Sequence, residues 1–131
     1  YLLASAVRAS LAQRLVRRLC PLCREEAKPT QEDLRSLGAW ARRLSGVPVW
    51  KAAGCPACLG GYKGRTGIYE LMVASPSLQE AIRAGRSVED LSKMAVAAGM
   101  RSLMEDGVEK IAQGETSVAE VLRAVGRATG G

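Results

Sequence analysis

The chain has 131 residues and a formal net charge of +6, and 47% of its residues are hydrophobic and 24% are charged. These values are typical of one ordinary globular domain, or of two small ones that share a core. Histidine is absent, which excludes His-based catalytic triads, Cys-His nucleophile pairs and mixed Cys/His metal sites.

Apolar residues recur at every fourth position near the start of the chain, at Leu3, Val7, Leu11, Leu15 and Leu19. This spacing predicts one amphipathic helix over residues 2–19. Pro21 cannot continue a helix, so the chain is expected to leave it there. Arg8 interrupts the apolar start and no cleavage-type segment follows, so we expect no secretory signal. The longest uncharged stretch, residues 52–62, is too short to span a bilayer.

All four cysteines stand in two short pairs, Cys20-x-x-Cys23 and Cys55-x-x-Cys58. A Cys-x-x-Cys turn points two sulfurs at one centre, and Zn²⁺ accepts four thiolates tetrahedrally. A catalytic zinc would need an open coordination position, whereas four cysteines fill all of them. The spacing therefore predicts one closed, structural zinc site with Cys20, Cys23, Cys55 and Cys58 as ligands.

Three other uses of these cysteines compete with zinc. Disulfides require an oxidising compartment, which nothing in the chain suggests. The second pair followed by Tyr62 resembles the second knuckle of a rubredoxin iron site, but that fold is short and rich in aromatics, and aromatics are 4% here. A redox dithiol of thioredoxin type needs only one such pair at the start of a helix. We favour zinc over each of these.

The residues between the two pairs predict a small helical insert. Thr30 reads as an N-cap before the acidic turn of Glu32 and Asp33, which opens a helix through about Leu44. Residues 47–51 are broken by Pro48 and serve as an extended lead into the second pair. The glycines of residues 60–64 are too closely spaced for a phosphate-binding loop and are expected to form a tight turn leaving the metal site.

After the second pair, residues 66–73 form the one convincing strand, with β-branched and aromatic side chains. Everything beyond it is predicted to be helical. Four helices are expected: from Ser75-Pro76 to Gly85, from Ser87 to Gly99, from about Met104 to Gly114, and from Thr116 or Ser117 to about Val125. In the last of these, Glu120 is expected to reach back to the helix start as part of a capping box.

Basic residues cluster within a dozen positions of the cysteines: Arg14, Arg17, Arg18, Arg24, Lys51, Lys63 and Arg65. We expect them to offset the negative charge of a tetrathiolate site. A nucleic-acid surface is the alternative, since basic zinc domains often bind nucleic acid. No aromatic platform and no groove-reading helix accompany these charges, so we expect no nucleic-acid partner. No catalytic constellation is found in the chain.

Several ordered motifs resemble those of secretion ATPases, the hexameric motors of type II secretion and their relatives that assemble type IV pili. They are LAQRLVRRLCP at residues 11–21, GCPAC at residues 54–58 and GYKGRTGIYEL at residues 61–71, followed by DGVEK, GETS and EVL at residues 106–110, 114–117 and 120–122. The resemblance covers nearly the whole chain and corresponds to the C-terminal zinc-binding and helical region of these motors. Thr66 inclines the comparison toward the type II secretion branch.

The resemblance implies that the ATP-binding and catalytic motifs of the parent lie upstream, so ATP and Mg²⁺ are cofactors of the parent only. The four cysteines match the zinc ligands of the family one for one, with no catalytic or nucleotide-binding residue in this piece. It also implies a hexameric parent on the cytoplasmic side of the inner membrane, held there through platform and assembly proteins rather than a transmembrane segment. The isolated piece is expected to hydrolyse no ATP.

Together, these inferences predict a mainly α fold with one short strand segment. Residues 1–19 would form a helix from the end of the ATPase core, and residues 20–65 a tetracysteine zinc subdomain with a helical insert. Residues 66–131 would form a strand followed by a small C-terminal helical subdomain.

Overall fold

The structure is a computed structural model, and it describes residues 9–126. It contains two two-stranded antiparallel sheets and, within the described residues, five helices and one 3₁₀ segment. The strands are β1 (Ala9–Leu19), β2 (Glu25–Ala27), β3 (Val49–Lys51) and β4 (Tyr62–Val73). The helical elements are α2 (Gln31–Leu37), the 3₁₀ segment η1 (Gly38–Leu44), α3 (Pro76–Arg83), α4 (Val88–Ala97), α5 (Leu103–Ala112) and α6 (Val118–Val125).

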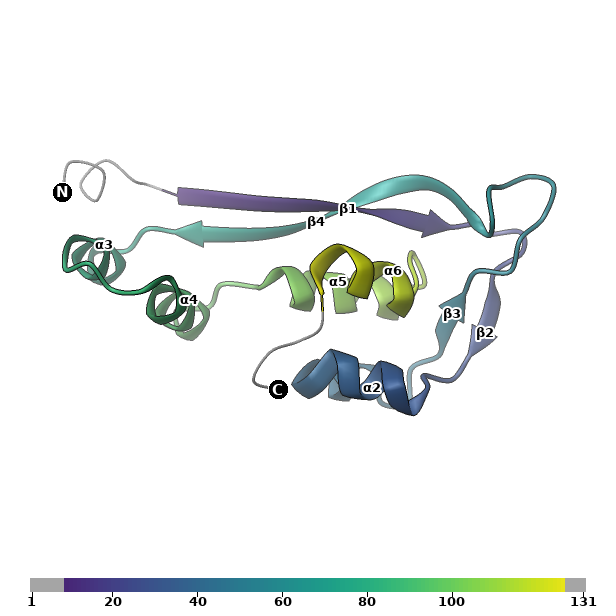
Figure 1. Ribbon diagram of the computed structural model, residues 1–131, viewed down its shortest axis with the longest axis horizontal. Coiled ribbons are helices and arrows are strands. Elements are labelled where there is room, and N and C mark those ends of the chain that lie inside the picture. The colour runs from purple at the N-terminus through teal and green to yellow at the C-terminus, as the bar shows by residue number, and fades with distance from the viewer. Residues whose placement is uncertain (1–8, 127–131) are drawn as a thin grey trace. The chain divides into compact units, whose positions relative to one another are not determined.

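The prediction of a mainly α fold with one short strand is wrong, because β1 replaces most of the helix predicted over residues 2–19. Residues 9–19 form an eleven-residue strand that pairs with β4 (Figure 1), and residues 2–8 lie outside the described part. A spacing of four residues equals two strand periods, so Leu11, Leu15 and Leu19 share a strand face as readily as a helix stripe. The pairing with β4 is a long-range contact that this local pattern does not reveal.

The strand predicted over residues 66–73 is confirmed, and it begins earlier, at Tyr62. A second sheet was not predicted. It joins the two segments that flank the helical insert, with Glu25 opposite Lys51, Glu26 opposite Trp50 and Ala27 opposite Val49.

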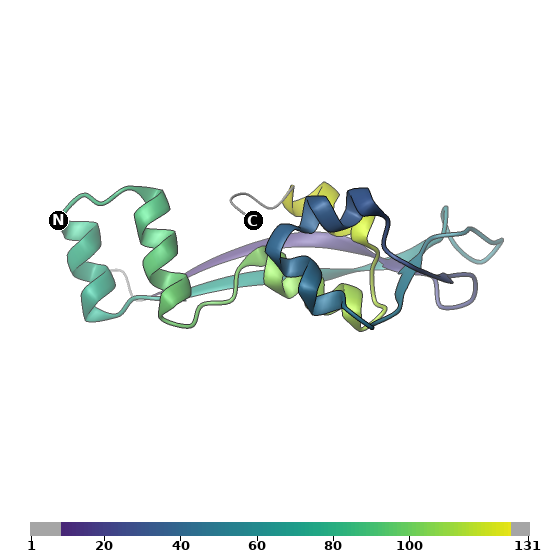
Figure 2. The same ribbon diagram turned by 90° about the horizontal axis from the view of Figure 1, so that it is seen from below.

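The chain divides into two compact units. Within the described residues, the first contains residues 9–13 and 69–102, and the second contains residues 14–68 and 103–126. In the first unit α3 and α4 pack on each other, as Figure 2 shows, and bury Leu78, Ala81 and Ala95. Both helices begin where the sequence predicts. The Ser75 hydroxyl accepts a hydrogen bond from the Leu78 N–H, and the Ser87 hydroxyl accepts one from the Asp90 N–H.

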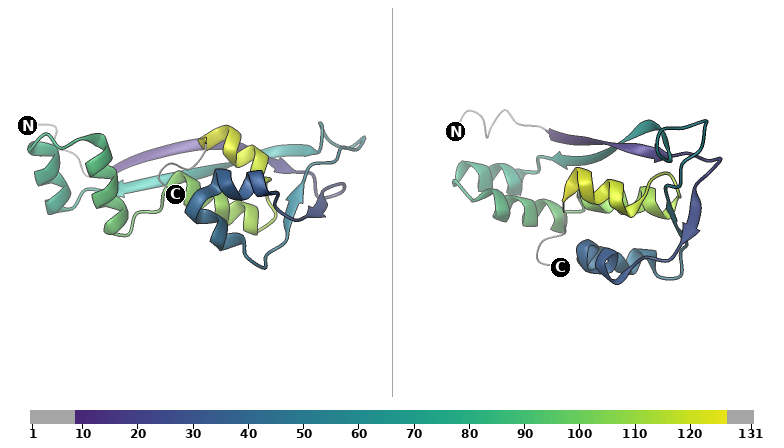
Figure 3. Two further views of the ribbon diagram at one scale, coloured as in Figure 1. Left: turned by 60° about the horizontal axis from the view of Figure 1, so that its bottom comes forward. Right: turned by 45° about the vertical axis from the view of Figure 1, so that its right-hand side comes forward.

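The second unit has a single apolar core between the helical insert and the last two helices. Helix α5 contacts η1 and β3, and α6 contacts α2; Figure 3 shows the insert lying beside α5 and α6. The buried members of this core are Leu37, Leu44, Val49, Met104, Val108, Ile111, Val118 and Val121. The predicted helix from Thr30 to Leu44 is present, with Thr30 and Asp33 forming a full capping box, but it tightens to 3₁₀ geometry at Gly38.

Candidate metal centre

A backbone hydrogen bond closes each cysteine pair into a turn. Cys20 follows β1 directly and is fully buried, and its carbonyl accepts a hydrogen bond of 3.1 Å from the Arg24 N–H. In the second pair, the Cys58 N–H donates to the Cys55 carbonyl at 3.2 Å. Each pair is thus a closed turn whose two sulfurs point the same way. Both turns belong to the second unit.

The four sulfurs gather at one point. The Sγ–Sγ distances are 3.8 Å between Cys20 and Cys55, 3.7 Å between Cys23 and Cys58, and 3.6 Å between Cys55 and Cys58. All four sulfurs lie within 4.8 Å of one another and none is in a disulfide. A tetrahedron with metal–sulfur bonds of about 2.3 Å has edges of about 3.8 Å. The cluster therefore has the size of a tetrathiolate metal site and could hold a metal ion.

Backbone hydrogen bonds and burial give the Cys55 and Cys58 thiols different pKa values. A hydrogen bond with the backbone of Ala57 lowers the pKa of Cys55, but burial and the neighbouring thiols outweigh it and raise that pKa to about 11. For Cys58, burial raises the pKa, but hydrogen bonds with the backbone of Cys55 and Gly61 outweigh it and lower the pKa to about 7. Of these two thiols, Cys58 is the one whose surroundings favour the thiolate, which is the form that binds a metal ion.

A two-residue hairpin turn leads out of the cluster, as the closely spaced glycines predict. Leu59 and Tyr62 exchange backbone hydrogen bonds of 3.0 and 3.1 Å across Gly60 and Gly61, which have φ values of 61° and 96°. Positive φ at both central residues is the geometry that glycine adopts most easily. Gly61 is also buried against the segment that contains Ala52, since a Cβ on Gly61 would lie 2.5 Å from the Ala52 Cβ.

Most of the nearby basic residues hold protein groups rather than face the thiols. Arg24 donates to the Gly114 carbonyl at 2.7 Å and lies over the Trp50 ring, 4.2 Å from its centroid. It thereby connects the first cysteine turn to the end of α5. The other pairings are Arg17 with Glu120, Arg18 with Glu115 and Lys51 with Glu25.

The strand that presents Cys20 is fastened to the start of α6 by hydrogen bonds. The Leu19 N–H donates to the Glu115 carbonyl at 2.9 Å, and the Thr116 hydroxyl donates to the Arg17 carbonyl at 2.8 Å. Ser117 caps α6 and shares a 2.7 Å hydrogen bond with the Tyr62 hydroxyl. These contacts fix the end of β1, and therefore Cys20, relative to the core of the second unit.

Glu120 has a structural role that sequence reasoning predicted only in part. Its carboxylate is 1% exposed and accepts hydrogen bonds from the Arg17 backbone and guanidinium at 2.7 and 2.8 Å and from Arg123 at 2.8 and 2.9 Å. The expected capping box is half right, because Ser117 accepts from the Glu120 N–H but the carboxylate reaches Arg17 instead. A partner more than a hundred positions away leaves no local signal in the sequence.

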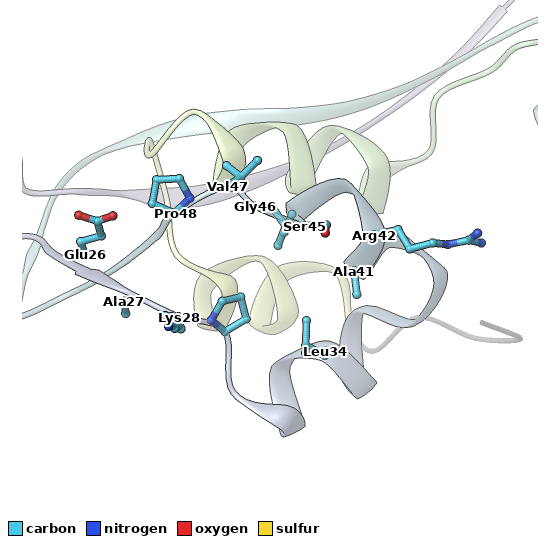
Figure 4. A pocket seen from close by; sticks show the side chains of 12 residues that line it. Glu26, Ala27, Lys28, Leu34, Ala41, Arg42, Ser45, Gly46, Val47 and Pro48 are labelled. Atoms are coloured by element: carbon cyan, nitrogen blue, oxygen red, sulfur yellow. The ribbon is translucent and has the colours of Figure 1, made fainter.

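A second feature of this unit is a groove on the helical insert, with a volume of about 1050 Å³. Its lining combines apolar side chains, such as Leu34, Ala41 and Val47, with the charged residues Glu26, Lys28 and Arg42 (Figure 4). Figure 4 shows Leu34 and Ala41 facing each other across part of the groove, with the Arg42 guanidinium extending away from it.

Within the described residues, none of the helices is both long enough and apolar enough to cross a bilayer.

Comparison with known proteins gives one consistent family. The profile described as "Type II/IV secretion system protein" matches residues 1–123. The chain is 47% identical over 124 residues to the "Type II secretion system protein HxcR" of Pseudomonas aeruginosa and 43% identical over 121 residues to the "Type IV pilus assembly ATPase PilB" of Thermus thermophilus. It is 37% identical over 124 residues to the "Type II secretion system ATPase E" of Vibrio cholerae.

These matches cover 94%, 92% and 94% of this chain, but only 22%, 14% and 24% of the three relatives. The chain thus spans less than a quarter of the length of each of these three curated relatives. Its relatives include both type II secretion and type IV pilus ATPases. The match over residues 1–123 shows that the chain belongs to the type II/IV secretion system protein family.

Proposed function

We propose that this chain is the C-terminal part of a hexameric secretion ATPase that drives protein export and pseudopilus assembly by type II secretion. In this proposal the piece binds a structural Zn²⁺ through Cys20, Cys23, Cys55 and Cys58, and it transmits motion or docks partners. Nucleotide binding and hydrolysis, with ATP and Mg²⁺, belong to residues upstream. Support comes from the family match and from the four sulfurs that lie within 4.8 Å of one another.

The observation that carries the metal assignment is the edge length of the sulfur cluster, which agrees with a thiolate tetrahedron. When bound, the ion would supply charge neutralisation for four thiolates and a cross-link between the two turns. The residues of the chain do the rest. The Gly54 N–H lies 3.4 Å from the Cys23 sulfur as a hydrogen-bond donor, and Arg24 fixes the first turn to Gly114.

Elemental analysis of the chain purified under reducing conditions tests this assignment. We expect about one zinc per chain, with no iron and no colour, and loss of the zinc in Cys20→Ser and Cys58→Ser. Ser36→Ala, a substitution of a buried residue in α2 away from the cluster, serves as the control and should retain the metal. A colourless, metal-free wild-type chain would refute the zinc assignment, and a red, iron-loaded chain would replace it.

Motion transfer is the proposed role of the second unit. The end of β1 is bonded to the start of α6 through Arg17 and Glu120, and α6 packs on the helical insert. A displacement of β1 by the upstream motor would therefore move the insert with the metal centre. We infer that the face over residues 30–50, which includes part of the groove, contacts the inner-membrane platform protein of the secretion system and keeps the parent at that membrane.

Charge reversal on this face tests the platform contact. Among the described residues, Arg42 has neither an ion pair nor a hydrogen bond from its side chain, whereas Arg43 is bonded to Glu105 at 3.2 Å and lies over Trp40. Arg42→Glu is therefore expected to weaken capture of the platform protein without loss of stability. Lys93→Glu, on an exposed residue of α4 outside this face, is the control. Unchanged capture by Arg42→Glu would count against this contact.

The type IV pilus branch is a second candidate, favoured by the 43% identity to the PilB of Thermus thermophilus. The proposed zinc site of this chain is the same for either candidate, and the two candidates differ in the machine that the parent would serve. Complementation of strains that lack either ATPase, with the parent carrying this region, separates the two.

A further inference from the structure

The residues exposed at the tips of the two cysteine turns are apolar. They are Pro21 and Leu22 in the first turn, Pro56 and Ala57 in the second, and Leu59 directly after it. Leu22 and Leu59 are 76% and 85% exposed. Neither turn has a charged residue between its cysteines. We call these five residues the knuckle-tip patch.

The cysteine cluster limits the distance between the two leucines. Leu22 precedes Cys23 and Leu59 follows Cys58, and the sulfurs of those cysteines are 3.7 Å apart. With consecutive Cα atoms about 3.8 Å apart, the two leucine Cα atoms are separated by no more than about 17 Å. Leu59 is further fixed as the first residue of the hairpin turn that it closes with Tyr62. Folding thus fixes two large apolar side chains in water, where they contribute nothing to the core.

Two cations stand next to the patch without a protein partner. Lys63 and Arg65 follow the glycine turn at the start of β4 and are exposed. Across residues 9–126, neither side chain takes part in an ion pair or hydrogen bond. The acidic residues nearest in sequence are Glu25 and Glu26 after the first cysteine turn and Glu70 further along β4, and Glu25 is paired with Lys51 at 3.7 Å. The cysteine sulfurs belong to buried or half-buried residues, so an approaching surface meets the leucines and these two cations first.

We propose that the knuckle-tip patch inserts into the interfacial layer of an anionic phospholipid bilayer, with Lys63 and Arg65 contacting lipid phosphates. Apolar side chains beside Lys and Arg are the composition that binds membrane interfaces, since the apolar part enters the acyl boundary and the cations meet anionic headgroups.

This inference rests on the proposed function only in that the bound metal holds the two turns together. It adds a direct lipid contact to a protein whose proposed attachment to the membrane is through partners. Such a contact would place the metal centre at the bilayer surface, beside the machine that the parent is proposed to drive.

Vesicle co-sedimentation tests the contact with the zinc-loaded full chain. The probe is vesicles of phosphatidylcholine with about 30 mol% phosphatidylglycerol, against vesicles of phosphatidylcholine alone. We expect binding to the anionic vesicles that is roughly tenfold weaker in Leu22→Ser/Leu59→Ser. We also expect Lys63→Gln/Arg65→Gln to weaken it by a similar factor and to reduce its salt dependence. Leu11→Ser/Leu71→Ser removes two exposed leucines elsewhere and should bind like the wild type.

A direct readout of insertion comes from Leu59→Trp, whose emission should shift to the blue on vesicle binding and be quenched by brominated acyl chains, after subtraction of the signal of Trp40 and Trp50. Zinc content measured on each sample separates the zinc proposal from the lipid proposal. A zinc-loaded chain that does not bind anionic vesicles overturns the lipid contact alone. Equal binding by wild type and Leu22→Ser/Leu59→Ser also overturns it. Loss of a protein partner by that variant, with no vesicle binding by wild type, would assign the patch to a protein instead.

Discussion

At the scale of single residues, the second unit depends on one buried carboxylate. Glu120 accepts hydrogen bonds from Arg17 and Arg123, both about half exposed, and from the Arg17 backbone. A buried carboxylate is tolerated only when it is paired in this way. The Arg123 guanidinium is the chief cause of its low pKa; together with Arg17 it outweighs burial and lowers the pKa of Glu120 to about 2.

Glu120→Gln should lower the free energy of unfolding by about 2 kcal/mol at pH 7, because charge-assisted hydrogen bonds become neutral ones. The low pKa also determines how the free energy of unfolding changes with pH. Since the folded-state pKa lies below the ordinary value of about 4.3, the ionised carboxylate stabilises the fold above that pH. This stabilisation is lost as the pH falls toward 2. Urea titrations between pH 7 and pH 2 should show this loss in the wild type and a smaller one in the variant.

The control for Glu120 is Glu32→Gln, which changes an exposed pair with Arg35 in the same unit and should cost less than about 0.5 kcal/mol. Equal effects of the two substitutions would contradict the role given to burial.

The glycine turn beside the metal centre offers a test with a matched pair of substitutions. Gly60 and Gly61 both have positive φ, but a Cβ on Gly60 meets nothing within 4 Å, whereas one on Gly61 meets Ala52 at 2.5 Å and the Ala53 nitrogen at 2.8 Å. Gly60→Ala should cost about 1 kcal/mol for its backbone conformation. Gly61→Ala should cost more and lower zinc affinity by at least about tenfold. Competition with a chromophoric chelator measures the affinity, and equal losses in both variants would argue against the close approach.

The candidate site was predictable from the sequence because its ligands are a local pattern. Cys20 with Cys23, and Cys55 with Cys58, need only a short turn to point two sulfurs one way, and the glycine spacing after Cys58 predicts the turn that follows. The hydrogen bonds that fix the site were not predictable. Arg24 with Gly114, and Arg17 with Glu120, join residues that are distant in sequence and have no pattern in common.

At the scale of elements, the fit between α5 and α6 depends on a glycine in the middle of a helix. Gly107 is buried in α5, and a Cβ there would lie 2.6 Å from Val121 Cγ1 on α6. Glycine costs a helix about 1 kcal/mol relative to alanine, so by helix propensity alone Gly107→Ala would stabilise the protein. The contact with Val121 reverses that expectation.

Gly107→Ala should therefore lower the free energy of unfolding by about 1–3 kcal/mol through overpacking. The double variant Gly107→Ala/Val121→Ala should be more stable than the sum of the single effects predicts, by at least about 1 kcal/mol, because the second change opens space for the new methyl group. Denaturant titrations of the four proteins measure this coupling. Additive effects, or stabilisation by Gly107→Ala alone, would mean that the two helices do not approach this closely.

Elements in this chain were predictable where their signals are local. The Ser75, Ser87 and Thr30 caps fixed three helix starts, and β-branched residues marked β4. The first strand was mispredicted because leucines at every fourth position fit a strand face as well as a helix stripe. What decides between them is the pairing of β1 with β4, which lies some fifty residues further along. The short β2–β3 sheet was not predicted for a similar reason, because a strand of three residues is too short to show an alternating pattern.

At the scale of the whole molecule, the second unit is stabilised by an apolar core and, in our proposal, by a bound metal ion. The apolar core joins α2, η1 and β3 to α5 and α6, and the proposed metal joins only the two cysteine turns. A helical insert as short as residues 30–44 is not stable by itself. The packing of Leu37 and Leu44 against α5 and α6 shows that the insert also shares a core with the C-terminal helices, so the effects of metal removal should be graded.

Chelation of the zinc-loaded chain should accordingly lower the melting temperature and speed amide hydrogen exchange most at the cysteine turns and in the adjoining β2 and β3. Exchange in α2 and η1 should change less, because the free energy of opening there includes the apolar core. The helices α3 and α4 belong to the other unit and serve as the internal control, with unchanged exchange. Peptide-resolved mass spectrometry before and after chelation measures all three regions. Uniform loss of protection through the insert would mean that the metal, rather than the core, holds it in place, and no change at the turns would mean that no metal was bound there.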